Sequence, residues 1–214
     1  MADIFNEIEE EIRHDRAKVV WKKYGKYVIG LAAVIVLITA GHTGWGEYEK
    51  SVRIDRSDRF VAAVGLVAEN NLTEAANVFS KLGEDGGAGY GTLSRFQSAA
   101  LKAKSGDAAG AVLSYDALSQ DGSVDELYQG LAVVMSVMHQ MGNGGGTALL
   151  DKLAPQLVDD APWRFTAREL AASLSAASGD LEKAKEYLVL ITDDLDAPQG
   201  IRARATERLK AMGG

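Results

Sequence analysis

Few side chains in this 214-residue sequence carry reactive groups, and their spacing argues against catalysis. The three histidines, His14, His42 and His139, lie far apart, and no two of them have the spacing of metal ligands. The sequence has no cysteine, which excludes thiol catalysis, disulfides and cysteine-based metal sites. We expect no catalytic residue, no metal site and no cofactor, and we expect His139 to be a partly exposed helix residue.

Two acidic pairs, Asp159–Asp160 and Asp193–Asp194, carry the groups that acid–base catalysis uses. Each pair follows an expected helix and comes shortly before Pro162 or Pro198, so a solvated loop is the better interpretation. The glycine-rich run 142–147 is similar to a phosphate-cradling loop, but it lacks the Lys-Ser/Thr ending and a preceding strand. The sequence therefore predicts a protein that is not an enzyme and has no small-molecule substrate.

The composition predicts an all-α fold. Alanine, the best helix former, is abundant, and the sequence has only three prolines, so long helices can run uninterrupted. Hydrophobic residues make up 47% and charged residues 25%, which is typical of a folded protein. The formal net charge of −7 argues against a nucleic-acid partner, because binding phosphates needs clustered Lys and Arg.

An apolar stretch without Lys, Arg, Asp or Glu lies between Lys26 and Glu47. Its twenty residues, at ~1.5 Å each, would span ~30 Å, the thickness of the hydrocarbon core of a bilayer. A cleaved signal peptide has a shorter apolar core, and a buried core helix rarely needs twenty such residues. The sequence therefore predicts one transmembrane helix over residues 26–48 that crosses the lipid bilayer, marked by Tyr27, Leu31, Ile35, Ile38 and Trp45.

Basic residues concentrate before this stretch, at Arg13, Arg16, Lys18, Lys22, Lys23 and Lys26. By the positive-inside rule, residues 1–25 stay in the cytoplasm and residues 49–214 lie in the periplasm of a bacterial cell, with a single pass through the inner membrane. Within residues 1–25, Ile4, Ile8 and Ile12 recur on one face of a charged amphipathic helix. That helix either lies on the membrane surface or docks on a membrane partner.

Residues 49–214 carry a weak internal repeat. Alanines at 75, 111, 148 and 184 open the second helix of four successive units and lie 36, 37 and 36 residues apart. Twelve residues before each alanine comes a small side chain, and four residues after it comes a large apolar or aromatic one in three units. The small residues are Ala63, Ala99, Ser136 and Ala172, and the later residues are Phe79, Tyr115, Lys152 and Leu188.

This spacing lets two antiparallel helices cross closely and lets the larger side chain fill the groove beside the crossing. Each pair then buries its remaining face on the next pair, which predicts a right-handed α-solenoid similar to tetratricopeptide repeats. The third unit departs most from the pattern, with Lys152 at the aromatic position and glycines at 142 and 144–146. Pro198 is expected to begin a last, capping helix.

In such a solenoid the first helix of each unit lines the concave side. The residues three before, one after and four after the small residue would then form an apolar groove that binds proteins. In the first three units these positions hold Phe60, Val64, Val67, Phe96, Ala100, Ala103, Val133, Val137 and Gln140. The predicted partner-binding residues are Phe60, Val64, Val67, Phe96, Val133 and Val137. The alternative is that tighter packing buries these positions as core.

The whole chain resembles a known family. Trp-Lys-Lys-Tyr-Gly at 21–25 before a membrane span, the exported repeats, and the segment Gly89-Tyr-Gly-Thr-Leu-Ser-Arg-Phe-Gln-Ser-Ala99 are similar to the ancillary-subunit family of the Sec translocon, in its alphaproteobacterial form. The resemblance implies a chaperone-like adaptor whose partners are the translocon, periplasmic chaperones and exported clients. The alternative is a scaffold for envelope assembly or cell division.

Overall fold

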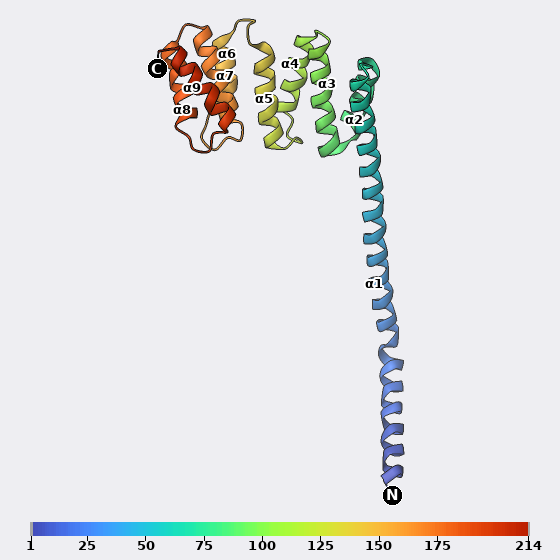
Figure 1. The fold of residues 1–214 in the computed structure, drawn as a ribbon. Helices are drawn as coiled ribbons and strands as arrows, with labels where there is room; N and C mark the ends of the chain where they lie inside the picture. Colours follow the sequence, from blue (N-terminus) through green and yellow to red (C-terminus); the bar gives the residue numbers. More distant parts are fainter. Residues whose placement is uncertain (1, 214) are drawn as a thin grey trace. The chain divides into compact units, whose positions relative to one another are not determined.

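The computed structural model describes the backbone of residues 2–213 and the side chains of residues 18, 21–27, 29–31 and 34–213. These residues form helices joined by short turns, and no strand occurs among them, so the predicted all-α fold is confirmed there (Figure 1). The helices are α1 (Ala2–Ala68), α2 (Leu72–Asp85), α3 (Thr92–Lys104), α4 (Ala108–Ser119), α5 (Glu126–Gln140), α6 (Gly146–Leu153), α7 (Arg164–Ala177), α8 (Leu181–Thr192) and α9 (Gln199–Ala211), with a π-helical turn η1 (Gly87–Gly91) and a 3-10 turn η2 (Ala154–Gln156).

The chain divides into two compact parts, an N-terminal part Met1–Asp55 and a C-terminal part Arg56–Gly214. The N-terminal part belongs to α1 throughout its described length. The predicted amphipathic face of residues 1–25, with Ile4, Ile8 and Ile12, lies outside the described side chains. A membrane-spanning length is present: the helical stretch Trp21–Ala68 contains an 18-residue window with a mean hydropathy of 1.8.

None of that window is buried inside the protein. The side chains chosen from the sequence as membrane markers are all exposed: Tyr27, Leu31, Ile35, Ile38 and Trp45. By length and composition this is the one helix of the described residues that could cross a bilayer. The crossing itself, over residues 26–48, stays a prediction.

The C-terminal part stacks four helix pairs in chain order and ends with a single helix (Figure 1). The pairs are the end of α1 with α2, α3 with α4, α5 with α6, and α7 with α8. We call them units one to four. Pro198 stands at the N-cap of α9, so the expected last helix begins where the sequence placed it.

Small side chains meet inside units one, two and four. Ala63 and Ala75 lie in one buried cluster with Phe79, and Ala99 and Ala111 lie in another with Tyr115. Ala172, Ala184 and Leu188 of unit four are likewise buried. The predicted close crossing with a larger residue beside it is therefore present in these three units.

Unit three differs by one residue. The small residue and the N-cap of the second helix are eight positions apart in units one, two and four, but Ser136 and Gly145 are nine apart. This longer turn moves Leu149 and Leu153 into the buried positions and leaves Ala148 exposed. The alignment of unit three on Ala148 and Lys152 was therefore wrong by one residue, because it assumed a constant turn length.

The turns explain why three units share one geometry. Asn70, Gly106 and Gly179 have φ values of 62°, 91° and 87°, the left-handed conformation that ends a helix. The next residue donates its N–H to a carbonyl five positions back, as from Asp107 to Lys102 at 2.9 Å. Asp107 and Asp180 then cap α4 and α8 by accepting hydrogen bonds from the N–H groups of Gly110 and Lys183.

Helix α9 covers the end of unit four. Ile201, Ala205, Leu209 and Met212 pack on a buried cluster, as the sequence predicted. The charged residues of α9 also bind the neighbouring helix. Arg204 forms a bidentate ion pair with Glu169 of α7, at 2.8 and 2.7 Å. This pair lowers the pKa of the Glu169 carboxyl, chiefly through the hydrogen bond from Arg204.

Candidate protein-binding surface

Most of the six predicted groove residues are partly or fully covered by neighbouring side chains. Phe60 packs on Tyr90, with ring centroids 5.7 Å apart, and Phe96 packs on Tyr128 at 6.3 Å. Val67 is half-buried in the cluster of unit one, whereas Val64 is 44% exposed. Phe60 and Phe96 also pack on Phe79 and Tyr115 of their own units, at 5.4 and 5.8 Å, so these two rings belong to the packing of the solenoid and leave Val64 as the exposed member.

Val137 corrects the groove prediction. Its side chain is fully buried, and Val133 is half-buried on the same cluster. The cluster contains Ala167 and Ala171 of α7, whose short side chains allow α7 to approach α5 closely. At Val137 the groove prediction is therefore wrong, and the alternative of a buried core position is right.

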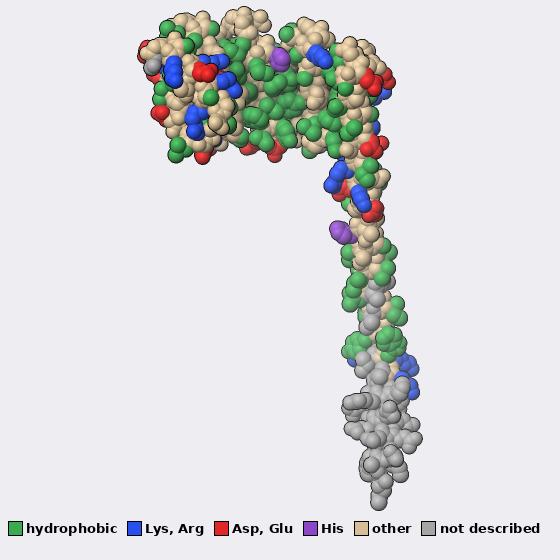
Figure 2. Space-filling model, viewed as in Figure 1, with side chains coloured by type: hydrophobic (Ala, Val, Ile, Leu, Met, Phe, Trp, Pro, Cys, Tyr) green, Lys and Arg blue, Asp and Glu red, His purple; other side chains and the backbone are tan. Residues whose placement is uncertain are grey.

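An exposed apolar surface lies on a different face of α5 from the one that carries Val133 and Val137. Leu127, Leu131, Met135 and Met138 recur on α5 at intervals of four, four and three residues, which is the spacing of a single helical stripe. We call these four residues the α5 face. Leu127 and Met138 are 42% and 44% exposed, and Leu131 and Met135 are half-buried. Figure 2 shows hydrophobic side chains gathered over the middle of the C-terminal part, Arg56–Gly214, where α3 to α5 lie.

Neighbouring units do not expose the same four positions to this extent. In unit four they hold Trp163, Ala167, Ala171 and Leu174, and in unit two they hold Tyr90, Ser94, Ser98 and Leu101. None of these eight residues is exposed. Sequence reasoning missed the α5 face because it took the groove positions from a regular repeat, although the stripe itself is visible as a helical period.

Aromatic rings join α3, α4 and α5 in the cluster on which Met135 of the α5 face packs. The ring of Phe96 lies 5.8 Å from that of Tyr115, and the ring of His139 stacks on Tyr115 at 5.6 Å with an interplanar angle of 6°. Burial raises the pKa of the Tyr115 hydroxyl. His139 is half-buried on a helix, as expected from the sequence.

Comparison with known families settles the kind of domain that carries this surface. Residues 18–188 match the model of the tetratricopeptide repeat-like domain family. The chain belongs to this family. No curated protein and no solved structure matches it. Tetratricopeptide repeat-like domains bind other proteins through surfaces of stacked helices, so the family supports a protein-interaction role.

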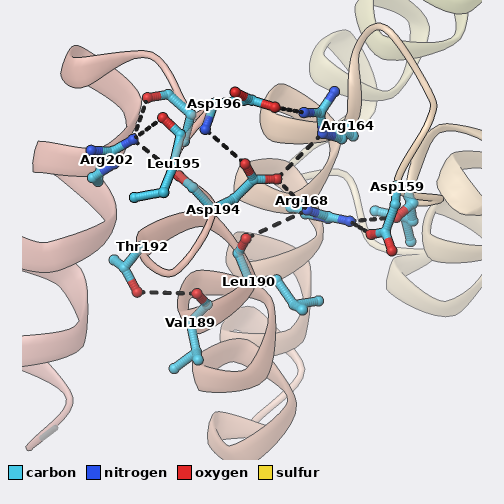
Figure 3. A network of polar contacts seen from close by, with 12 residues as sticks. Asp159, Arg164, Arg168, Val189, Leu190, Thr192, Asp194, Leu195, Asp196 and Arg202 are labelled. Carbon is cyan, nitrogen blue, oxygen red and sulfur yellow. Dashed lines mark hydrogen bonds and ion pairs between the residues drawn. The ribbon is translucent and has the colours of Figure 1, made fainter.

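One member of each acidic pair, Asp159 or Asp194, contacts arginine side chains of α7 (Figure 3). The guanidinium of Arg168, whose side chain is 2% exposed, donates a short hydrogen bond to Asp159 and longer ones to the carbonyls of Leu157 and Leu190. Asp194 lies 4.0 Å from Arg168 and 3.6 Å from Arg164. Asp159 itself stays exposed, as expected for a loop residue.

Arg202 completes this network from α9. Its Nη2 donates to the carbonyls of Asp194, Leu195 and Ala197 at 2.8 to 3.0 Å, which fixes the loop before α9. The network joins α7, α8 and α9. Among the described residues no group of three or more His, Asp or Glu side chains is arranged to hold a metal ion.

Proposed function

We propose that this protein is a non-enzymatic, membrane-anchored adaptor with a chaperone-like role at the protein-export translocon of a bacterial inner membrane. The observation that carries the proposal is a tetratricopeptide repeat-like domain with an exposed apolar helix face, in the same chain as a helix long and apolar enough to span a bilayer. The N-terminus would be cytoplasmic and the repeats periplasmic.

The α5 face supports binding to apolar segments of other proteins. Two of its four residues are methionines, whose unbranched side chains adapt to partners of different shape. Met135 packs on the cluster that contains Tyr115, and His139 of the same helix stacks on Tyr115, so α5 is held on α4 and little ordering is needed on binding. An adaptor that binds many different exported chains needs a helix that is fixed in position and side chains that adapt to each partner.

In-cell photocrosslinking tests the binding surface directly. A photoreactive phenylalanine analogue at Met138 or Leu131 in the full-length chain should crosslink to translocon subunits or exported proteins. Leu195 provides the matched control, since it is 90% exposed and apolar but lies on a loop away from α5. Equal crosslinking from Leu195 and Met138, or none from either, contradicts the proposal, and crosslinks to division proteins at Met138 favour the envelope scaffold.

The predicted orientation has its own test, since the absence of native cysteine makes single labels clean. Lys18→Cys and Gln120→Cys introduce thiols at two exposed positions on opposite sides of the predicted span. In intact spheroplasts an impermeant maleimide should label Gln120→Cys and leave Lys18→Cys unlabelled until the membrane is broken. The reverse pattern refutes the orientation, and labelling of both refutes the anchor.

A further inference from the structure

The turn between α5 and α6 is built from glycines that surround one asparagine. Gly142, Gly144 and Gly145 have φ values of 92°, 88° and 75°, which only glycine adopts without strain. Asn143 stands between the first two, and residues 142–145 are all exposed. The phosphate-cradling interpretation of this run has no support in the fold, so its chemistry is open to another explanation.

We propose that Asn143 is a site of spontaneous deamidation, independent of the proposed adaptor function. The deprotonated backbone nitrogen of Gly144 attacks Cγ of Asn143, forming a new N–C bond and a five-membered succinimide. The Cγ–Nδ2 bond breaks, and the amide nitrogen leaves as ammonia with the proton. Water then adds to one of the two ring carbonyls and opens the ring, giving aspartate or isoaspartate without any redox step.

Three features of the turn favour this reaction. Gly144 has no Cβ to obstruct the attack, and its flexible neighbours let the asparagine side chain reach the required angle. Within the described part of the chain, the Gly144 N–H donates no hydrogen bond, so the nucleophile needs no prior release. Asn143 is also exposed, which gives water access to the succinimide. Asparagine is among the thermolabile residues for this kind of reason.

The other described asparagines lack these features and serve as internal controls. For Asn70, the attacking nitrogen would be that of Asn71, which donates to the carbonyl of Leu66 at 2.8 Å. Asn71 precedes Leu72, a bulkier residue that begins α2. Asn77 lies inside α2 and precedes Val78, whose branched side chain and helical hydrogen bond both oppose ring closure.

The product changes the surface of unit three. Asn143 and Gly144 line an open cleft of about 450 Å³ together with Val112, Leu113 and His139. Deamidation places a carboxylate in this mainly apolar cleft, two residues before the N-cap of α6, where the helix dipole favours negative charge. Older copies of the protein would therefore present a more acidic cleft while keeping the helices intact.

Peptide mapping by mass spectrometry of the full-length protein in detergent micelles, after incubation at pH 8, tests the proposal. The peptide with Asn143 should gain the mass of one deamidation and separate into two isomers, faster at pH 8 than at pH 6, while Asn70, Asn71 and Asn77 stay unchanged. Gly144→Ala should slow the reaction roughly tenfold, which corresponds to about 1.4 kcal/mol of activation free energy, and Asn143→Gln should abolish it. The proposal is overturned if Asn143 stays intact, or if Asn70 or Asn77 reacts as fast in the folded protein.

Discussion

Unit two and unit three are both helix pairs, but the chemistry at the helix crossing differs between them. In unit two the two helices meet through Ala99, Ala111 and Tyr115, which belong to one apolar cluster. In unit three the residue equivalent to Ala99 is Ser136, whose hydroxyl is fully buried and donates to Asp116 at 2.5 Å. Lys152 reaches both groups, at 2.5 Å from Asp116 and 2.8 Å from Ser136.

The extra residue in the turn before α6 explains this difference. It puts Leu149, instead of a small alanine, at the place where α6 faces α5. A leucine holds the two helices further apart than an alanine does, so polar groups can occupy the crossing. Asp116 belongs to α4 and Lys152 to α6, so the cluster joins unit two to unit three. A change in turn length has therefore added a polar cluster between the units, while Leu149 and Leu153 keep unit three packed on Val134 and Val137.

The largest expected effect comes from the apolar crossing. Tyr115→Ala should lower the free energy of unfolding by roughly 3–5 kcal/mol, because it leaves a cavity among enclosed neighbours. Lys152→Ala should cost about 1–2 kcal/mol, since Asp116 keeps access to water and Ser136 keeps its hydrogen bond to Asp116. Urea unfolding of the full-length protein in detergent micelles, followed by circular dichroism, measures both. Leu195→Ala, on a 90% exposed side chain, is the control and should change nothing. An equal loss from Tyr115→Ala and Lys152→Ala refutes the contrast.

The polar cluster of unit three should behave as a group. Asp116→Ala alone removes the shared acceptor of Ser136 and Lys152 and should cost about 1–3 kcal/mol. The triple variant Asp116→Ala, Ser136→Ala, Lys152→Leu removes every partner together, so the loss should be smaller than that of the single variant. Thermal unfolding of the original protein, of the three single variants Asp116→Ala, Ser136→Ala and Lys152→Leu, and of the triple variant measures the coupling. Strictly additive losses would show that the three residues act independently.

The contrast between the units also marks how far the sequence can predict the structure. Ala99, Ala111 and Tyr115 were predictable, because a small residue and an aromatic at fixed spacing leave one way to pack two helices. Leu149 and Leu153 were not, because a period computed from alanines cannot register one extra glycine in a turn. The α5 face was also missed. Its exposure depends on how closely α3, α5 and α7 approach one another, and that depends on side chains far apart in the sequence.

A smaller effect should come from the caps. Asp107 accepts the Gly110 N–H at 2.8 Å in unit two, so Asp107→Ala should cost about 1 kcal/mol. In unit three the N-cap is Gly145 with φ of 75°, where aspartate would be strained by about 1–2 kcal/mol. Gly145→Asp should therefore destabilise the protein although it copies the residue used in unit two. A gain in melting temperature from Gly145→Asp would mean that turn geometry does not separate the two units.

The smallest effect concerns the turn between unit two and unit three, which joins α4 to α5. Asp121 accepts hydrogen bonds from the Ser123 hydroxyl and N–H and from Arg95 of α3, and these lower its pKa from 3.8 to about 2. Because the folded pKa lies below the unfolded one, this group stabilises the fold above pH 3.8, and the contribution disappears as the pH falls toward 2. Asp121→Asn should be less stable than the original protein at neutral pH, and the gap should close between pH 4 and pH 2, as measured by unfolding at a series of pH values. Parallel pH curves for the two proteins would show that the carboxylate does not hold this turn, and that the ion pair between Arg95 and Asp121 adds nothing to the packing of unit two on unit three.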